Sequence, residues 1–330
     1  MRNIIYVRAD DPSAALDALR GSPGSQLLAG GTDLIPLMKD DIAQASGLVD
    51  LGKWSAGSSV QFHEGDLVIG ALTPLSTLEK EPGIVSRFPA LAQACGLAAT
   101  PQLRNMGTIG GNLLQQTRCW YYRGPYHCWL KGGEKCYARD GENELHSVFM
   151  TGPGESPCVS AHPSDPAPAL LVYNARLRLL NQQGESEIDL RDFFALPEDD
   201  RRNFVTLEAG QLVTALVLPA PDASSRSVYL KAMPRASWAF ALAGVAVNVR
   251  LEGDMLTEAR VALSGVAPIP VRMAEAETFL AGTHVADLDY NLAADRLVAA
   301  AKPLAHNGYK VDLLRGIFKE ALRTLLAGEG

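Results

Sequence analysis

The chain has 330 residues, of which 47% are hydrophobic, 20% charged and 7% aromatic, as expected for a globular protein with more than one domain. A net charge of −7 argues against nucleic acid or an anionic membrane surface as the main partner. No apolar stretch reaches the roughly 18 residues of a membrane-spanning helix, and residues 1–8 lack the hydrophobic region or twin arginine of an export signal.

The first 55 residues predict a compact α/β unit. Asp11-Pro12-Ser13 is typical of a helix start, because the aspartate can cap the helix and proline suits its first turn. The expected strands are residues 4–7, 26–29 and 47–51, and the expected helices are residues 14–19 and 34–39.

From residue 56 the pattern predicts a hairpin, two helices and two further strands. The hairpin pairs residues 60–63 with 66–70, one helix opens at Thr73 and another runs through Cys95 to Ala99, and strands follow at 175–180 and 212–219. The linker at 220–225 is the predicted domain boundary. Beyond it we expect an antiparallel sheet and then helices, with strands at 227–231, 244–251 and 259–264 and an amphipathic helix at 313–322.

Two glycine-rich turns are candidates for holding a phosphate group. Gly30-Gly31-Thr32-Asp33 stands between a strand and a helix, where backbone N–H groups and the helix N-terminus favour an anion. Gly107-Thr108-Ile109-Gly110-Gly111 is the second turn, and we expect it at a strand boundary too. Each alone is equally a plain tight turn, and neither has G-x-G-x-x-G spacing or a Walker lysine. Together they fit a diphosphate held from both sides.

These motifs resemble the flavoprotein subunit of the xanthine dehydrogenase family. Residues 27–34 and 104–112 resemble its two FAD pyrophosphate loops, and residues 163–170 its next flavin motif. Lys231, followed by residues 235–239, resembles the segment with the flavin-side lysine. The resemblance covers essentially the whole chain and implies an FAD site formed by Leu27, Leu28, Ala29, Gly30, Gly31, Thr32, Asp33, Leu34, Thr108, Gly110, Gly111, Asn112, His162, Ser164, Asp165, Val213 and Lys231.

The resemblance also implies the fold. It is α+β, with a two-part FAD-binding domain of the vanillyl-alcohol-oxidase type over residues 1–222 and a C-terminal domain of the carbon monoxide dehydrogenase flavoprotein type over 223–330. Within the first domain we expect subdomains at about 1–55 and 56–222. In such a flavin site Asp165 would contact the FAD, Val213 would lie beside the isoalloxazine, and Lys231 would set the charge near the ring. No catalytic residue is assigned.

The sequence departs from the family pattern by a cysteine-bearing insertion at residues 113–162. Its cysteines, Cys119, Cys128, Cys136 and Cys158, are 9, 8 and 22 residues apart. Disulfides are disfavoured in an otherwise cysteine-poor chain. Structural zinc usually shows closely spaced cysteine pairs, which are missing here, and a [4Fe–4S] cluster also takes four thiolates. Spacing alone does not choose between zinc and iron–sulfur.

Resemblance favours the [4Fe–4S] cluster. The flavoprotein subunits of 4-hydroxybenzoyl-CoA reductase and of bacterial periplasmic aldehyde oxidoreductase carry an additional cluster here, and residues 118–121 and 158–165 resemble the latter. His127, His146 and His162 are alternative ligands, but we interpret each as a surface or supporting residue. Cys95, in an alanine-rich segment, is interpreted as a buried core residue.

The resemblance implies an electron-transfer subunit of a heterotrimeric molybdenum hydroxylase, with an aldehyde as substrate. A large subunit would carry molybdopterin and a small subunit two [2Fe–2S] clusters, while this chain would hold FAD and [4Fe–4S]. A stand-alone flavin oxidase and a zinc-stabilised interaction subunit are the alternatives. The terminal electron acceptor is not readable from the sequence. The compartment would be the cytoplasm, or the periplasm by co-export with a partner that carries a twin-arginine signal.

Overall fold

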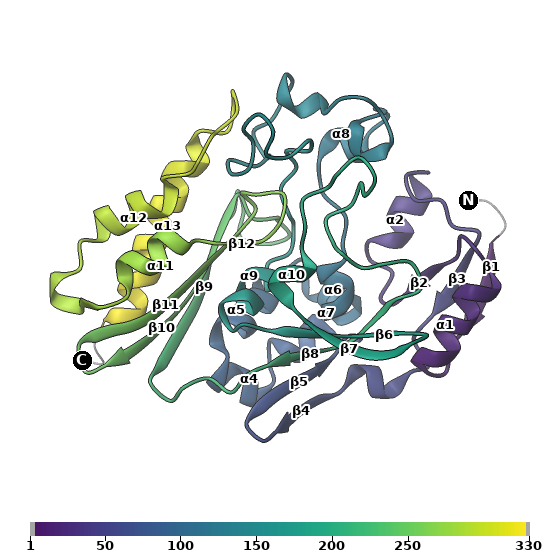
Figure 1. The fold of residues 1–330 in the computed structure, drawn as a ribbon, viewed down its shortest axis with the longest axis horizontal. Helices are drawn as coiled ribbons and strands as arrows, with labels where there is room; N and C mark the ends of the chain where they lie inside the picture. Colours follow the sequence, from purple (N-terminus) through teal and green to yellow (C-terminus); the bar gives the residue numbers. More distant parts are fainter. Residues whose placement is uncertain (1–3, 328–330) are drawn as a thin grey trace.

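Three β-sheets organise the computed structural model, which describes residues 4–327 (Figure 1). The first is parallel, with strand order β1-β3-β2, and two helices accompany it, as the sequence predicts. Asp11 caps the first helix by accepting a hydrogen bond from the Ala14 N–H at 2.8 Å. The elements are β1 (Ile5–Arg8), α1 (Pro12–Gly21), β2 (Gln26–Leu28), α2 (Leu34–Lys39) and β3 (Gly47–Asp50).

The second sheet is antiparallel, with strand order β4-β5-β8-β6-β7. The hairpin of β4 and β5 and the strands β6 and β8 confirm the predicted strands. The strand β7 was not predicted, because its sequence is exposed and charged and has no apolar alternation. The strands are β4 (Val60–His63), β5 (Asp66–Gly70), β6 (Arg176–Asn181), β7 (Gly184–Asp189) and β8 (Leu212–Leu218).

Short helices lie between these strands in the sequence. Only α3 and α5 were predicted. The others include α4 and α6, although proline opens both and Thr100 caps α6. The prediction that the second glycine turn lies at a strand boundary is wrong, because Gly107 and Thr108 connect α6 to α7 and residues 109–111 begin α7. The helices are η1 (Ser55–Ser58), α3 (Leu75–Leu78), α4 (Pro82–Arg87), α5 (Pro89–Leu97), α6 (Pro101–Met106), α7 (Ile109–Leu113), α9 (Pro166–Val172) and α10 (Leu190–Phe193).

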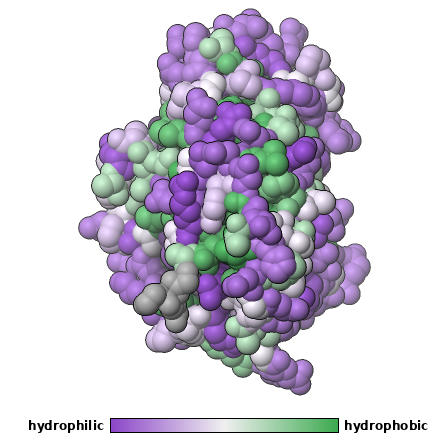
Figure 2. Space-filling model, turned by 90° about the vertical axis from the view of Figure 1, so that its left-hand side faces the viewer, coloured by the Kyte–Doolittle hydropathy of each residue, from purple (hydrophilic) through white to green (hydrophobic). Residues whose placement is uncertain are grey.

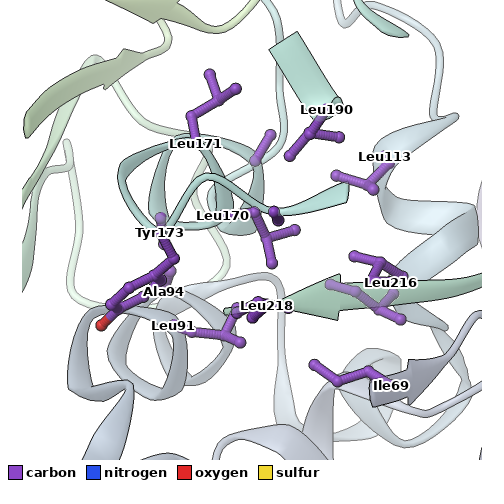
Figure 3. Close-up of a cluster of buried hydrophobic side chains, with 14 of the residues drawn as sticks. Ile69, Leu91, Ala94, Leu113, Leu170, Leu171, Tyr173, Leu190, Leu216 and Leu218 are labelled. Carbon is purple, nitrogen blue, oxygen red and sulfur yellow. The ribbon is translucent and has the colours of Figure 1, made fainter. Parts of the chain in front are cut away.

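Helix α9 is buried along its whole length and forms the centre of the main core. Figure 3 shows side chains from several elements gathered around it: Ile69, Leu91, Ala94, Leu113, Leu170, Leu171, Tyr173, Leu190, Leu216 and Leu218. The same cluster continues into the third sheet through Tyr229, Ala246 and Ala262. The two halves of the chain therefore share one continuous apolar interior, and burying this apolar surface stabilises their contact.

The third sheet is antiparallel, as predicted, with order β12-β11-β10-β9, and β13 pairs with β11. Helices α11 to α13 cover one face, whereas α5 and α9 contact the other (Figure 1). The elements are β9 (Ser225–Ala232), β10 (Ala243–Glu252), β11 (Met255–Ser264), β12 (Val271–Arg272), α11 (Ala274–Leu280), β13 (Thr283–His284), η4 (Val285–Asp287), α12 (Tyr290–Val298) and α13 (Tyr309–Leu326).

Helix α13 is amphipathic, as its sequence predicts. It buries Leu314, Phe318 and Leu322 toward the sheet, and the molecule's face on this side mixes hydrophilic and hydrophobic patches (Figure 2). No helix within residues 4–327 combines the length and apolarity that crossing a bilayer requires.

The cysteine-bearing insertion has little regular structure and packs onto the C-terminal half. The N–H groups of Val148 and Phe149 donate to the Val266 carbonyl at 2.8 and 3.0 Å, and both side chains join the C-terminal core. At the two ends of the insertion, the Ser164 hydroxyl donates to the Asn112 side-chain oxygen at 2.6 Å. Its short helices are α8 (Trp120–Arg123), η2 (Trp129–Lys131) and η3 (Tyr137–Arg139).

Candidate functional site

The two glycine turns touch each other. A Cβ atom at Gly30 would lie 1.8 Å from the Met106 carbonyl oxygen, at the end of α6, and 3.2 Å from the Gly107 nitrogen. Any side chain at residue 30 would therefore force the turns apart. Gly31 adopts a φ of +70°, which favours glycine. The close approach requires glycine at residue 30, and the positive φ favours glycine at residue 31.

Both turns line one cavity of about 930 Å³. This volume lies near the upper end of the range of about 300–1,000 Å³ for ligand pockets, so the cavity suits a large ligand. Of the predicted cofactor residues, His162, Ser164 and Lys231 do not line it. Those that do are Leu27, Leu28, Ala29, Gly30, Gly31, Thr32, Asp33, Leu34, Thr108, Gly110, Gly111, Asn112, Asp165 and Val213.

The two turns differ in the hydrogen bonds that their backbones can offer. Within the described chain, the N–H groups of residues 30–33 have no protein acceptor. By contrast, the N–H groups of residues 109–112 donate to Thr73, Ala71 and Thr108. The expectation that the second turn offers free amides is wrong for these four residues. Because α2 has six residues and α7 five, neither adjoining helix is long enough to contribute much dipole.

His162 and Ser164 shape the segment that leads into α9. Burial, with the positive charge of Arg118 acting in the same direction, lowers the pKa of His162 to about 3, so this imidazole is neutral at neutral pH. Its ring lies edge-on to Phe194, 5.1 Å between centroids. The Ser164 hydroxyl accepts a hydrogen bond from the Ala167 N–H at 3.1 Å. Both side chains therefore support the cavity wall from behind.

Lys231 and Asp165 form a buried ion pair. The Lys231 Nζ lies 2.7 Å from the Asp165 Oδ2, and the side chains are 0% and 4% exposed. Tyr229 donates to the other carboxylate oxygen at 2.6 Å, and Lys231 also donates to the Leu97 carbonyl at 3.0 Å. Burial raises the pKa of Asp165, whereas the Lys231 charge opposes that rise. Asp165 thus reaches the cavity wall with both oxygens already in hydrogen bonds.

Sequence reasoning missed a second charged group, at the edge of the first turn. Asp33 Oδ1 lies 2.9 Å from a guanidinium nitrogen of both Arg118 and Arg123, and Asp33 Oδ2 accepts the Gln116 N–H at 2.8 Å. Burial lowers the pKa of Arg118 to about 10, so the group stays protonated at neutral pH. The start of the insertion is therefore bound to the first glycine turn through one carboxylate. The only sequence signal was the position of Arg118 next to Cys119.

Two exposed aromatic residues also line the cavity and were not predicted. Trp238, with a φ of +52°, and Phe240 belong to the segment between β9 and β10 and are 62% and 48% exposed. The Arg118 guanidinium lies 4.8 Å from the centroid of the Phe240 ring, a cation–π distance. The C-terminal half thereby contributes to the mouth of the cavity.

The four insertion cysteines line a second, much smaller cavity of about 10 Å³, together with Thr117, Tyr121, Tyr122, Trp129, Leu130 and Tyr137. All four are free thiols, so they form no disulfide. As they stand, no three or more His, Cys, Asp or Glu side chains in residues 4–327 converge on one metal-ion position. Tyr122 lines both this cavity and the large one. The two cavities therefore share Tyr122 as a lining residue.

The cysteines differ in their ease of ionisation. Interaction with the neighbouring Cys158 thiol lowers the pKa of Cys136 to about 6, and the same interaction raises the pKa of Cys158. Burial raises the pKa of Cys119 to about 11. His146 Nε2 lies 3.2 Å from the Cys119 Sγ, whereas His127 is exposed.

Comparison with known proteins agrees with this arrangement. Residues 2–221 match the family described as the FAD binding domain in molybdopterin dehydrogenase, and residues 228–325 match the CO dehydrogenase flavoprotein C-terminal domain. The fold and site thus define an FAD-binding oxidoreductase subunit. The chain belongs to the FAD-binding medium subunits of the molybdenum hydroxylase family, which confirms the fold class expected from the sequence.

Individual relatives match along nearly their whole length. The aldehyde oxidoreductase FAD-binding subunit PaoB of Escherichia coli is 33% identical over 99% of this chain and 98% of its own. The carbon monoxide dehydrogenase medium chain of Hydrogenophaga pseudoflava is 27% identical over 94% and 93%. A solved structure of that dehydrogenase, lacking the Mo-pyranopterin moiety of its molybdenum cofactor, superposes with a TM-score of 0.78 at 25% identity, covering 99% of this chain and 98% of that one.

Proposed function

We propose that this chain is the FAD- and [4Fe–4S]-containing electron-transfer subunit of a heterotrimeric aldehyde oxidoreductase. Electrons from a molybdenum centre in a large subunit would arrive through the [2Fe–2S] clusters of a small subunit and leave to an external acceptor. The similarity to the Escherichia coli subunit supports the aldehyde as substrate. The single observation that carries the proposal is that Tyr122 lines both the large cavity and the cysteine cavity.

The large cavity has the properties that an FAD site needs. The contact of Gly30 with Met106 brings the two turns together, which supports a shared ligand, and the free N–H groups of residues 30–33 suit a diphosphate. Asp165 and Val213 lie on the cavity wall, while His162, Ser164 and Lys231 hold that wall in place. Bound FAD supplies the ability to take up electrons singly and release them in pairs, and the chain supplies binding and orientation.

The cysteine cavity has the donor set of a [4Fe–4S] site. Four thiols face one space whose walls include Tyr121, Tyr122, Trp129 and Tyr137, and such walls exclude water from a cluster. A single zinc ion needs its four sulfurs about 2.3 Å from one point, whereas a four-iron cluster spreads its ligands more widely. Loading would require Cys136 and Cys158, whose thiols now interact with each other, to move apart.

Metal and flavin analysis of the co-purified complex tests the proposal. We expect flavin absorption with an added broad brown absorption, and iron beyond that of the small subunit. Replacing Cys119, Cys128, Cys136 or Cys158 by alanine should remove that additional iron. The matched control is Cys95→Ala, because Cys95 is fully buried in the main core, away from the insertion; iron should be unchanged. Zinc in place of iron, or a colourless complex, would overturn the proposal.

A separate measurement distinguishes the stand-alone flavin oxidase. Under anaerobic conditions an aldehyde should bleach the flavin absorption of the whole complex but not that of this chain alone, because the substrate would react at the large subunit. Bleaching of the isolated chain would favour the oxidase.

A further inference from the structure

The wall of the large cavity contains very little positive charge. Among the described residues that line it, Arg118 is the only lysine or arginine, whereas three carboxylates line it: Asp33, Asp165 and Glu208. Lys231 neutralises Asp165 from behind the wall. A diphosphate carries two negative charges, and a hydrogen bond from a cationic side chain would stabilise it more than one from a neutral donor.

Arg118 is held in position by four contacts. Its Nη2 lies 2.9 Å from Asp33 and 3.0 Å from the Gln115 side-chain oxygen, its Nη1 donates to the Gln116 carbonyl, and its guanidinium lies over the Phe240 ring. The side chain nevertheless remains 28% exposed and lines the cavity. A planar guanidinium with several N–H donors can serve Asp33 and a phosphate oxygen together.

The charged side chains beside the first glycine turn carry a net positive charge. Asp33 contributes one negative charge, and Arg118 and Arg123 contribute two positive charges, so the group of three carries +1. Arg123 completes the group from outside, because it does not line the cavity. The charge lies beside the turn whose N–H groups at residues 30–33 have no protein acceptor.

We propose that Arg118, a residue of the cysteine-bearing insertion, binds the diphosphate of the flavin together with the N–H groups of residues 30–33. This inference rests on the proposed function. Because Arg118 directly precedes Cys119, one short segment would contact both cofactor sites.

The test compares two arginines that share the same carboxylate. Arg118→Gln and Arg123→Gln each remove one ion pair to Asp33, but only Arg118→Gln removes the cation of the cavity. Binding of FAD and of riboflavin, which has no phosphate, is measured by flavin fluorescence quenching in the flavin-depleted complex. We expect Arg118→Gln to weaken FAD binding about tenfold or more, with riboflavin binding within about twofold of wild type. Arg123→Gln should change FAD binding much less, and Arg118→Lys should restore part of it.

Other outcomes separate the inference from the function. If Arg118→Gln weakens riboflavin as much as FAD, or if both glutamine variants weaken FAD equally, Arg118 has only a structural role and the inference fails. If Arg118→Gln does not fold, the Arg118→Lys variant provides the test. If this variant loses no more affinity for FAD than for riboflavin, the inference is overturned. Absence of FAD from the wild-type complex would instead overturn the proposed function.

Discussion

Lys231 of β9 and Asp165 at the start of α9 form an ion pair of 2.7 Å that joins the two halves of the chain. Because both side chains are buried, neither can exchange its partner for water. Removing one member leaves the other as an uncompensated buried charge, which is costly. The pair therefore contributes more to the domain contact, and to the position of Asp165 on the cavity wall, than an exposed pair could.

Lys231→Met should lower the free energy of unfolding by about 3–5 kcal/mol, as measured by urea denaturation. The matched control is Lys53→Met, since Lys53 pairs with Asp10 on the surface at 3.1 Å; its effect should stay below about 1 kcal/mol. Replacing both members, as Lys231→Met with Asp165→Leu, should cost less than the sum of the single changes. An additive result would mean that the two residues are not coupled.

Gly30→Ala should abolish FAD binding, because the new Cβ would meet the Met106 carbonyl at 1.8 Å and separate the two turns. Flavin content of the purified complex is the measurement. Gly316→Ala is the control: Gly316 lies within α13 with no atom in reach of a Cβ, and the change should raise stability by about 0.5–1 kcal/mol. Normal flavin content in Gly30→Ala would show that the turn contact is not needed.

Burial of Lys310 should make the free energy of unfolding depend on pH. It is fully buried, donates to the Gly265 carbonyl at 2.8 Å, and burial lowers its pKa from 10.5 to about 7. Between pH 7 and 10.5 the unfolded chain therefore holds a proton that the folded chain has lost, so stability rises with pH, by at most about 1.4 kcal/mol per unit. Lys310→Met should be more stable than wild type at pH 6.5, and this advantage should vanish as pH approaches 10. Urea denaturation at several pH values checks this, and a constant difference contradicts it.

Removal of metal should make Cys136 the fastest cysteine to alkylate near pH 7. Its lowered pKa favours the reactive thiolate, and the side chain is partly accessible, whereas Cys119 has a raised pKa. Mass spectrometry after brief iodoacetamide treatment of the metal-depleted protein measures the order. Cys158→Ala should slow the reaction of Cys136, since the interaction that lowers its pKa is lost. Equal rates at Cys119 and Cys136 would contradict the assignment.

Local signals predicted much of the fold. The run of β2, Gly30-Gly31 and α2 was readable because apolar runs and punctuating glycines act over a few residues. Helix α6 was missed although Thr100 and Pro101 mark its start, since the segment was interpreted through its glycines. Strand β7 offered no apolar face to recognise.

The site was predictable as a set of residues but not as a set of contacts. Asp165 and Lys231 were both predicted as cofactor residues, but the ion pair between them, 66 residues apart in the sequence, was not predicted. Asp33 was named as a turn residue, while its arginine partners lie 85 and 90 positions away. Such long-range contacts depend on the packing of whole elements, which no local pattern encodes.

The hydrogen bond between Asn112 and Ser164 at 2.6 Å shows that the two ends of the cysteine-bearing insertion lie side by side. Such an insertion could be gained or lost as one unit, because its two ends lie close enough for the flanking residues to keep their positions. A shorter homologue that bridges these two points directly would keep the glycine contact between the turns. Such a homologue would lack both Arg118 and the four cysteines, so the cation of the cavity and the cysteine site should be present or absent together.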